Sequence, residues 1–247
     1  MSPYEHTALY ELKRWQHKVS RKPSILSKLS RRVQHKINNV IPEKVHVAIT
    51  AAIKQMVRAV LFGSGIITGK VVTHLSLEER EKLVKERIEF YKKTAAVEGG
   101  VTGAGGILLG LADFPILLSL KIKLLFEIAA IYGHNMNDVR ERLYLLYIFQ
   151  LAFSNQEHRR QVYQQTLNWQ LKYHELPMNI DDFNWRLFQQ EYRDYIDLAK
   201  LAQLVPVIGA AVGFVVNYRL VIRLGDTAIN AYRMRFFGAV ALSNVSS

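Results

Sequence analysis

Few residues in this 247-residue chain have the types and spacing that catalysis or metal binding requires. Ser64 lies between two glycines, but Phe62 and Ile66 occupy the positions where a nucleophile elbow, G-x-S-x-G, has its glycines. The eight histidines are scattered without metal-ligand spacing, and the chain contains no cysteine. We therefore expect no metal site, no cofactor and no disulfide, and the sequence favours a non-enzymatic protein over an enzyme.

The glycine-rich segment 99–106 does not have the pattern of a nucleotide-binding loop. It lacks the Lys-Ser/Thr pair that closes a P-loop. It also fails G-x-G-x-x-G, because Leu108 stands where the third glycine should follow Gly103 and Gly105. Nucleotide binding is therefore not indicated.

Asp113 is the one ionisable residue within the apolar run that follows those glycines. It could be a buried functional group, or it could cap a helix that continues through Pro115. An aspartate at the N-cap, followed closely by a proline in the first helical turn, is a common helix start. We interpret Asp113 and Pro115 as a helix cap.

The net charge of +12 is concentrated at the N-terminus, since residues 1–75 hold 13 Lys and Arg against 3 Asp and Glu. Residues 12–42 contain nine basic residues and no acidic residue. Such a patch is typical of a protein that binds lipid headgroups or nucleic acid. The nine residues are Lys13, Arg14, Lys18, Arg21, Lys22, Lys28, Arg31, Arg32 and Lys36.

These basic residues fall in segments whose apolar residues recur at helical spacing, first Ala8, Leu12, Trp15 and Val19, and then from Ile25 to Val40. An apolar helix face suits either a bilayer surface or the protein's own core. No DNA- or RNA-binding motif is present, so nucleic acid is not the expected partner. We predict that the nine basic residues bind an anionic membrane surface.

Helical patterns continue along the whole chain, and the sequence predicts an all-α helical bundle. Ser2 and Glu5, and again Ser76 and Glu79, have the spacing of capping boxes, and Asp138 can cap a further helix. No long run alternates with a period of two residues, as a half-buried strand would. We expect a single domain over residues 1–247, with basic amphipathic helices in residues 1–75.

Two glycine-rich apolar segments, residues 99–133 and 201–237, are predicted to form helical hairpins at the centre of this domain. As helices their uncharged runs would measure roughly 20–27 Å, which is shorter than the ~30 Å hydrocarbon core of a bilayer. They can be helices buried in a soluble bundle or hairpins that enter one leaflet, and a two-pass membrane protein is disfavoured. Small residues four apart allow two helix backbones to approach closely, so we expect the two segments to pack together. These residues are Gly106, Gly110, Gly209 and Gly213.

The chain resembles the EcsC family of bacterial proteins over nearly its whole length. The likeness lies in the N-terminal LYELKRWQ, in GAGGILLGLADFPILLSLKIKLLFEIAAIYG and in LVPVIGAAVGFVVNYRLVIRLGDTAINAYRMRFF. The family is often encoded beside the subunits of an ABC transporter and has no established biochemical activity or catalytic residues to transfer. The resemblance implies a helical protein that works with, or near, a membrane transporter.

Together these observations predict a non-enzymatic, membrane-peripheral accessory protein associated with an ABC transporter or with membrane homeostasis. The expected location is the cytoplasm, at the inner face of the cell membrane, with the anionic lipid surface and ABC transporter subunits as partners. The alternative is an enzyme that acts on lipid or peptide, soluble or at the membrane surface, for which no catalytic motif is visible.

Overall fold

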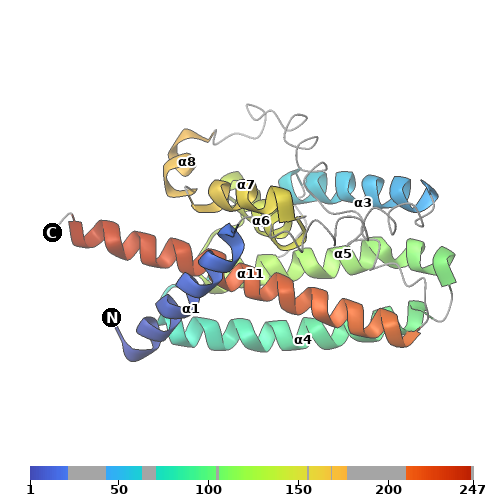
Figure 1. Cartoon of the computed structure of the whole chain (residues 1–247), viewed down its shortest axis with the longest axis horizontal. Coiled ribbons are helices and arrows are strands. Elements are labelled where there is room, and N and C mark those ends of the chain that lie inside the picture. The colour runs from blue at the N-terminus through green and yellow to red at the C-terminus, as the bar shows by residue number, and fades with distance from the viewer. Residues whose placement is uncertain are drawn as a thin grey trace.

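The computed structural model describes residues 1–21, 43–62, 71–103, 106–154, 156–167, 169–176 and 210–245. Over these residues the chain forms α-helices and no β-sheet, which confirms the predicted all-α class (Figure 1). The predicted second basic helix, around residues 25–40, lies outside them. The helices are α1 (Pro3–Ser20), α3 (Glu43–Phe62), α4 (Leu77–Gly103), α5 (Gly106–Ile131), α6 (Val139–Phe153), α7 (Gln156–Leu167), α8 (Trp169–Glu175) and α11 (Ala210–Val245).

Three helices begin at the caps that the sequence predicts. The Ser2 hydroxyl accepts a hydrogen bond from the backbone of Glu5, whose carboxylate accepts one from the backbone of Ser2, and this capping box starts α1. Ser76 and Glu79 make the same reciprocal pair before α4. Asp138 accepts from the Arg140 backbone at 2.9 Å and caps α6. Local hydrogen bonding therefore explains where these helices begin.

Helices α4 and α5 form an antiparallel hairpin, and α11 lies along it (Figure 1). The first glycine-rich segment contains the end of α4, which extends to Gly103, and the whole of α5, which begins at Gly106. The second segment differs from the expectation over its described part, because α11 is one continuous helix from Ala210 onward. Figure 1 shows the start of α11 at the same end of the bundle as the end of α4 and the start of α5.

Helix α6 lies at the centre of the core. From Leu143 to Phe153 its residues are apolar or aromatic except for Gln150, and all of these side chains but Tyr147 are buried. A helix without a polar face must be covered all round. The Tyr144 ring packs against the buried indole of Trp169 in α8, with ring centres 4.9 Å apart.

The predicted helix cap at Asp113 and Pro115 is wrong. Helix α5 begins at Gly106 and continues through both residues, so Pro115 lies inside the helix. A proline at an interior position removes one backbone hydrogen bond. The helix continues past it because Phe114, Leu117 and Leu118 are all buried in the core, and this packing holds both sides of the proline.

Gly225 of α11, which the sequence did not single out, packs directly against a side chain of α4. A methyl group at this position of α11 would lie 2.4 Å from Cδ1 and 2.6 Å from Cγ1 of Ile88 in α4. Of the four glycines predicted to pack, Gly106 and Gly110 lie in α5, Gly213 lies in α11, and Gly209 lies outside the described residues. Their mutual contact remains a prediction.

Replacing Gly225 with alanine should lower the free energy of unfolding by about 1–3 kcal/mol, because Ile88 would have to move. Gly238 in the same helix is the matched control, since a methyl group there meets nothing within 4 Å. Gly238→Ala should be neutral or should stabilise by about 0.5–1 kcal/mol through the lower entropy of the unfolded chain. Urea denaturation of both variants measures the difference. Equal effects of the two substitutions would show that α4 and α11 are not in close contact at Gly225.

Candidate functional site

The basic face of α1 is the predicted functional surface that the structure describes best. Lys13, Arg14, Lys18 and Arg21 are all exposed. The other five predicted residues, Lys22, Lys28, Arg31, Arg32 and Lys36, lie outside the described residues. Three of these cations lie on α1 and Arg21 follows its last residue, and their binding to an anionic surface stays a prediction.

The apolar face of α1 packs on the protein's own core. Ala8, Leu12 and Val19 are 1%, 3% and 8% exposed. The Trp15 ring also lies edge-on to Tyr163 of α7, with ring centres 6.1 Å apart. Of the two uses that the sequence allows for this face, bilayer or core, the structure shows the core.

A buried ion pair links α11 and α4 and extends to α1. The Arg233 guanidinium on α11 donates from Nε and Nη2 to the two carboxylate oxygens of Glu81 on α4, both at 2.6 Å. Its third nitrogen, Nη1, donates to Glu11 of α1 at 2.8 Å. Arg233 and Glu81 are buried, so one arginine joins α11 and α4 within the core and reaches α1 through the exposed Glu11.

Two tyrosine hydroxyls also donate hydrogen bonds to the Glu81 carboxylate. Tyr4 of α1 donates to Oε2 at 2.7 Å, and Tyr132 donates to Oε1 at 3.3 Å. Burial, together with the hydrogen bond to Glu81, raises the pKa of Tyr4, and burial raises the pKa of Tyr132 well above its usual value. Both hydroxyls therefore remain protonated donors. With four donors on one carboxylate, this cluster is a satisfied structural ion pair.

A second arginine on α11 makes a corresponding pair with α6. Arg235 donates to both carboxylate oxygens of Glu141, at 2.5 and 2.8 Å, and its guanidinium lies 4.8 Å from the centre of the Tyr144 ring. His134 Nδ1 lies 3.5 Å from the same carboxylate. Burial alone would raise the pKa of Glu141, but the hydrogen bonds from Arg235 and His134 outweigh it and lower the pKa to about 2.

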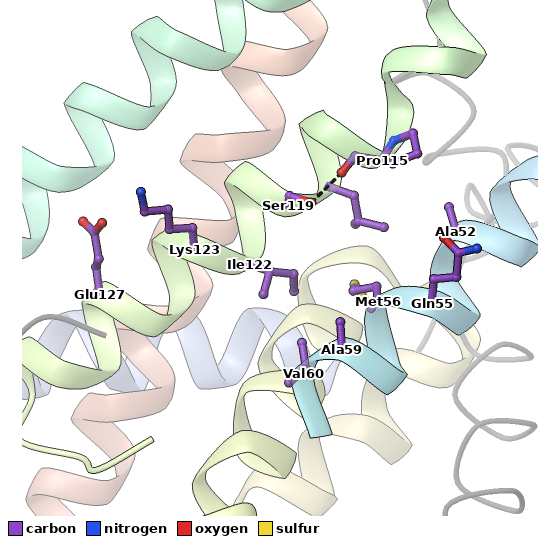
Figure 2. A pocket seen from close by; sticks show the side chains of 11 residues that line it. Ala52, Gln55, Met56, Ala59, Val60, Pro115, Ser119, Ile122, Lys123 and Glu127 are labelled. Carbon is purple, nitrogen blue, oxygen red and sulfur yellow. Dashed lines mark hydrogen bonds between the residues drawn. The ribbon is translucent and has the colours of Figure 1, made fainter. Parts of the chain in front are cut away.

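A groove of about 780 Å³ lies between α3 and α5. Figure 2 shows Met56 of α3 and Ile122 of α5 pointing toward one another across it, with Lys123 and Glu127 at one end. Two of its four polar side chains have partners, since the Ser119 hydroxyl donates to the Pro115 carbonyl at 2.7 Å and Glu127 accepts from Tyr91 at 2.6 Å. Most of the lining is apolar. Its lining is Ala52, Gln55, Met56, Ala59, Val60, Pro115, Leu118, Ser119, Ile122, Lys123 and Glu127.

Within the described ranges, no group of three or more His, Asp or Glu side chains is placed to hold a metal ion. In the same ranges, no helix has both the length and the apolar character needed to span a membrane. The sequence analysis missed Arg233 and Arg235. The signal that could have indicated them is a pair of arginines two residues apart, flanked by aromatic residues in an otherwise apolar stretch of helix.

Residues 6–237 match the family model described as the EcsC protein family. The chain belongs to the EcsC family. It is 47% identical over 234 residues to "Protein EcsC" of Bacillus subtilis (strain 168), a match that covers 94% of this chain and 96% of that protein. It is also 25% identical over 252 residues to "Uncharacterized protein YdbA" of the same strain, covering 93% of this chain and 92% of that protein. No solved structure matches the chain.

Replacing Arg233 with methionine should lower the free energy of unfolding by about 3–5 kcal/mol, because Glu81 would remain buried without its cation. The double variant Glu81→Gln/Arg233→Met should recover part of this loss, since it buries no unpaired charge. Arg87→Met is the matched control, because Arg87 is half exposed and lies 3.7 Å from Glu127, and such surface pairs contribute about 0–1 kcal/mol. If Arg233→Met cost no more than Arg87→Met, α11 would not depend on this ion pair.

The Glu141 pair should make stability depend on pH under acidic conditions. A carboxyl whose pKa is lowered on folding, here from 4.5 to about 2, stabilises the fold above its unfolded pKa. That contribution should disappear as the pH falls from about 4.5 to about 2. Urea unfolding across this range should show a smaller pH slope for Glu141→Gln than for the unmodified protein. An unchanged slope would mean that Glu141 titrates normally in the folded state.

Proposed function

We propose that this EcsC family protein is a non-enzymatic, membrane-peripheral accessory protein that binds the anionic inner face of the cell membrane. The observation that carries the proposal is the orientation of α1. Its apolar side chains Ala8, Leu12 and Val19 are buried in the bundle, while Lys13, Arg14, Lys18 and Arg21 are exposed. A helix held in this way presents charge without presenting its apolar face. Binding would therefore be electrostatic and reversible.

The composition of the surface favours lipid over nucleic acid. The Tyr10 ring is 64% exposed on α1, next to Arg14, whose guanidinium lies 6.0 Å from the ring centre. Tyrosine beside a cation is typical of the membrane interface, where the ring lies at the level of the headgroups. The basic residues that follow α1 also fall in a segment with amphipathic helical spacing, a pattern that suits a bilayer surface.

The proposed partner beyond the lipid surface is an ABC transporter, whose assembly or activity the protein would support. This part rests on the family resemblance, because the family is often encoded beside transporter subunits. A protein held loosely at the membrane by charge could reach such subunits without an inserted segment of its own. A role in membrane homeostasis is the broader form of the same proposal.

Binding to vesicles tests the proposal. The protein should sediment with vesicles that contain phosphatidylglycerol and should not sediment with pure phosphatidylcholine. Each Lys or Arg near the membrane surface contributes about 1 kcal/mol to the free energy of binding at low salt. Replacing Lys13, Arg14 and Arg21 with glutamine should therefore weaken binding on the order of 100-fold. Replacing Arg58, Lys82 and Lys93, exposed residues of α3 and α4, removes the same charge from other helices and should have a much smaller effect.

Two results would contradict the proposal. One is equal loss of vesicle binding in both triple variants, which would mean that net charge and not α1 determines binding. The other is tight binding to duplex DNA at physiological salt with no binding to anionic vesicles, which would assign the basic face to nucleic acid.

A further inference from the structure

A second basic feature lies beside α1, in a pocket of about 330 Å³ that the sequence analysis did not predict. Four basic side chains from three helices line it, and Asp226 is the one acidic residue in the lining. The four are Lys18 of α1, Arg159 of α7, and Arg219 and Arg223 of α11. Segments that are distant in the sequence thus place four cations around one small volume.

The helices explain this arrangement. Arg219, Arg223 and Asp226 recur at intervals of four and three residues, so they lie on one face of α11. Lys18 belongs to the exposed basic face of α1, so the pocket continues the surface that the proposed function uses. Arg159 donates from Nη2 to the Ser154 carbonyl at 3.4 Å, which holds its side chain against the end of α6.

Apart from Thr227, the rest of the lining is apolar and aromatic. Trp15, Val19, Leu151 and Ile222 form the walls between the cations. Such walls lower the local dielectric and strengthen the attraction of the cations for an anion inside the pocket. Trp15 is partly buried, and tryptophan at the boundary between an apolar and a wet region is typical of groups that lie at headgroup level.

We propose that this pocket binds a phosphate group. Guanidinium groups match phosphate oxygens in geometry and charge, and the ammonium group of a lysine adds a further hydrogen-bond donor. The proposal rests on the proposed function, which would supply the phosphate as the headgroup of an anionic phospholipid at the membrane surface. The same basic side chains would also bind free phosphate, and an experiment can distinguish a lipid headgroup from free phosphate as the ligand.

The experiment compares two kinds of vesicle with the same negative surface charge. In one the charge comes from phosphatidylglycerol, and in the other it comes from oleate, which carries a carboxylate and no phosphate; both use a phosphate-free neutral glycolipid as the bulk lipid. The pocket variant is Lys18→Gln/Arg219→Gln. The matched control is Lys13→Gln/Arg21→Gln, which removes the same charge from α1 and its C-cap, outside the pocket lining.

The unmodified protein should prefer the phosphatidylglycerol vesicles. The pocket variant should lose this preference, with binding to them on the order of 10–30-fold weaker, while the control variant should bind both vesicles more weakly by equal factors. Calorimetric titration with inorganic phosphate is the third arm. Uptake of phosphate that the pocket variant lacks, without any preference between the vesicles, would identify free phosphate as the ligand.

The outcomes separate the two proposals. If the protein binds neither vesicle, the proposed function is wrong. If it binds both equally, takes up no inorganic phosphate and loses binding equally in both double variants, the membrane role stands and the phosphate pocket is wrong. Circular dichroism of each variant checks that the helical fold is retained.

Discussion

Two buried arginines on α11 join this helix to α1, α4 and α6. Arg233 and Arg235 are two residues apart, so at roughly 100° per residue they face nearly opposite sides of the helix. Arg233 pairs with Glu81 of α4 and Glu11 of α1, and Arg235 pairs with Glu141 of α6. A buried ion pair adds little net stability, but removing one partner is costly because it leaves a buried charge unpaired. Such pairs favour one register of α11 over its alternatives.

The position of α1 follows from this constraint. Arg233 and Glu81 reach α1 through Glu11 and Tyr4, at the same place where the apolar face of α1 enters the core. Once that face is buried, the exposed basic residues are what α1 presents to the outside. The exposed charge is therefore a consequence of the internal packing, and it gives the protein a surface that suits an anionic membrane.

The parts of the fold that depend on neighbours in sequence were predictable. The capping boxes at Ser2 and Ser76 and the cap at Asp138 each depend on two residues that are two or three positions apart in the sequence. Each of them starts the expected helix. The same rule failed at Asp113, because the packing of the residues around Pro115 overrides the local preference for a helix start. Long-range features were not predictable: Arg233 and Glu81 are 152 residues apart, and the contact of Gly225 with Ile88 depends on how α11 lies on α4. The pocket around Lys18 and Arg219 combines three helices and has no local signature for the same reason.

The central claim is that α1 stays packed on the core while its basic face meets the membrane, and the distance between α1 and α4 tests it most directly. Because the chain has no cysteine, spin labels can be attached to a His17→Cys/Glu86→Cys variant, both exposed positions, without other changes. Pulsed electron paramagnetic resonance then gives the distance between the labels in solution and on phosphatidylglycerol vesicles. The account predicts the same narrow distance distribution in both conditions. A longer or much broader distribution on vesicles would contradict it, because α1 would then have left the core to place its apolar face in the bilayer.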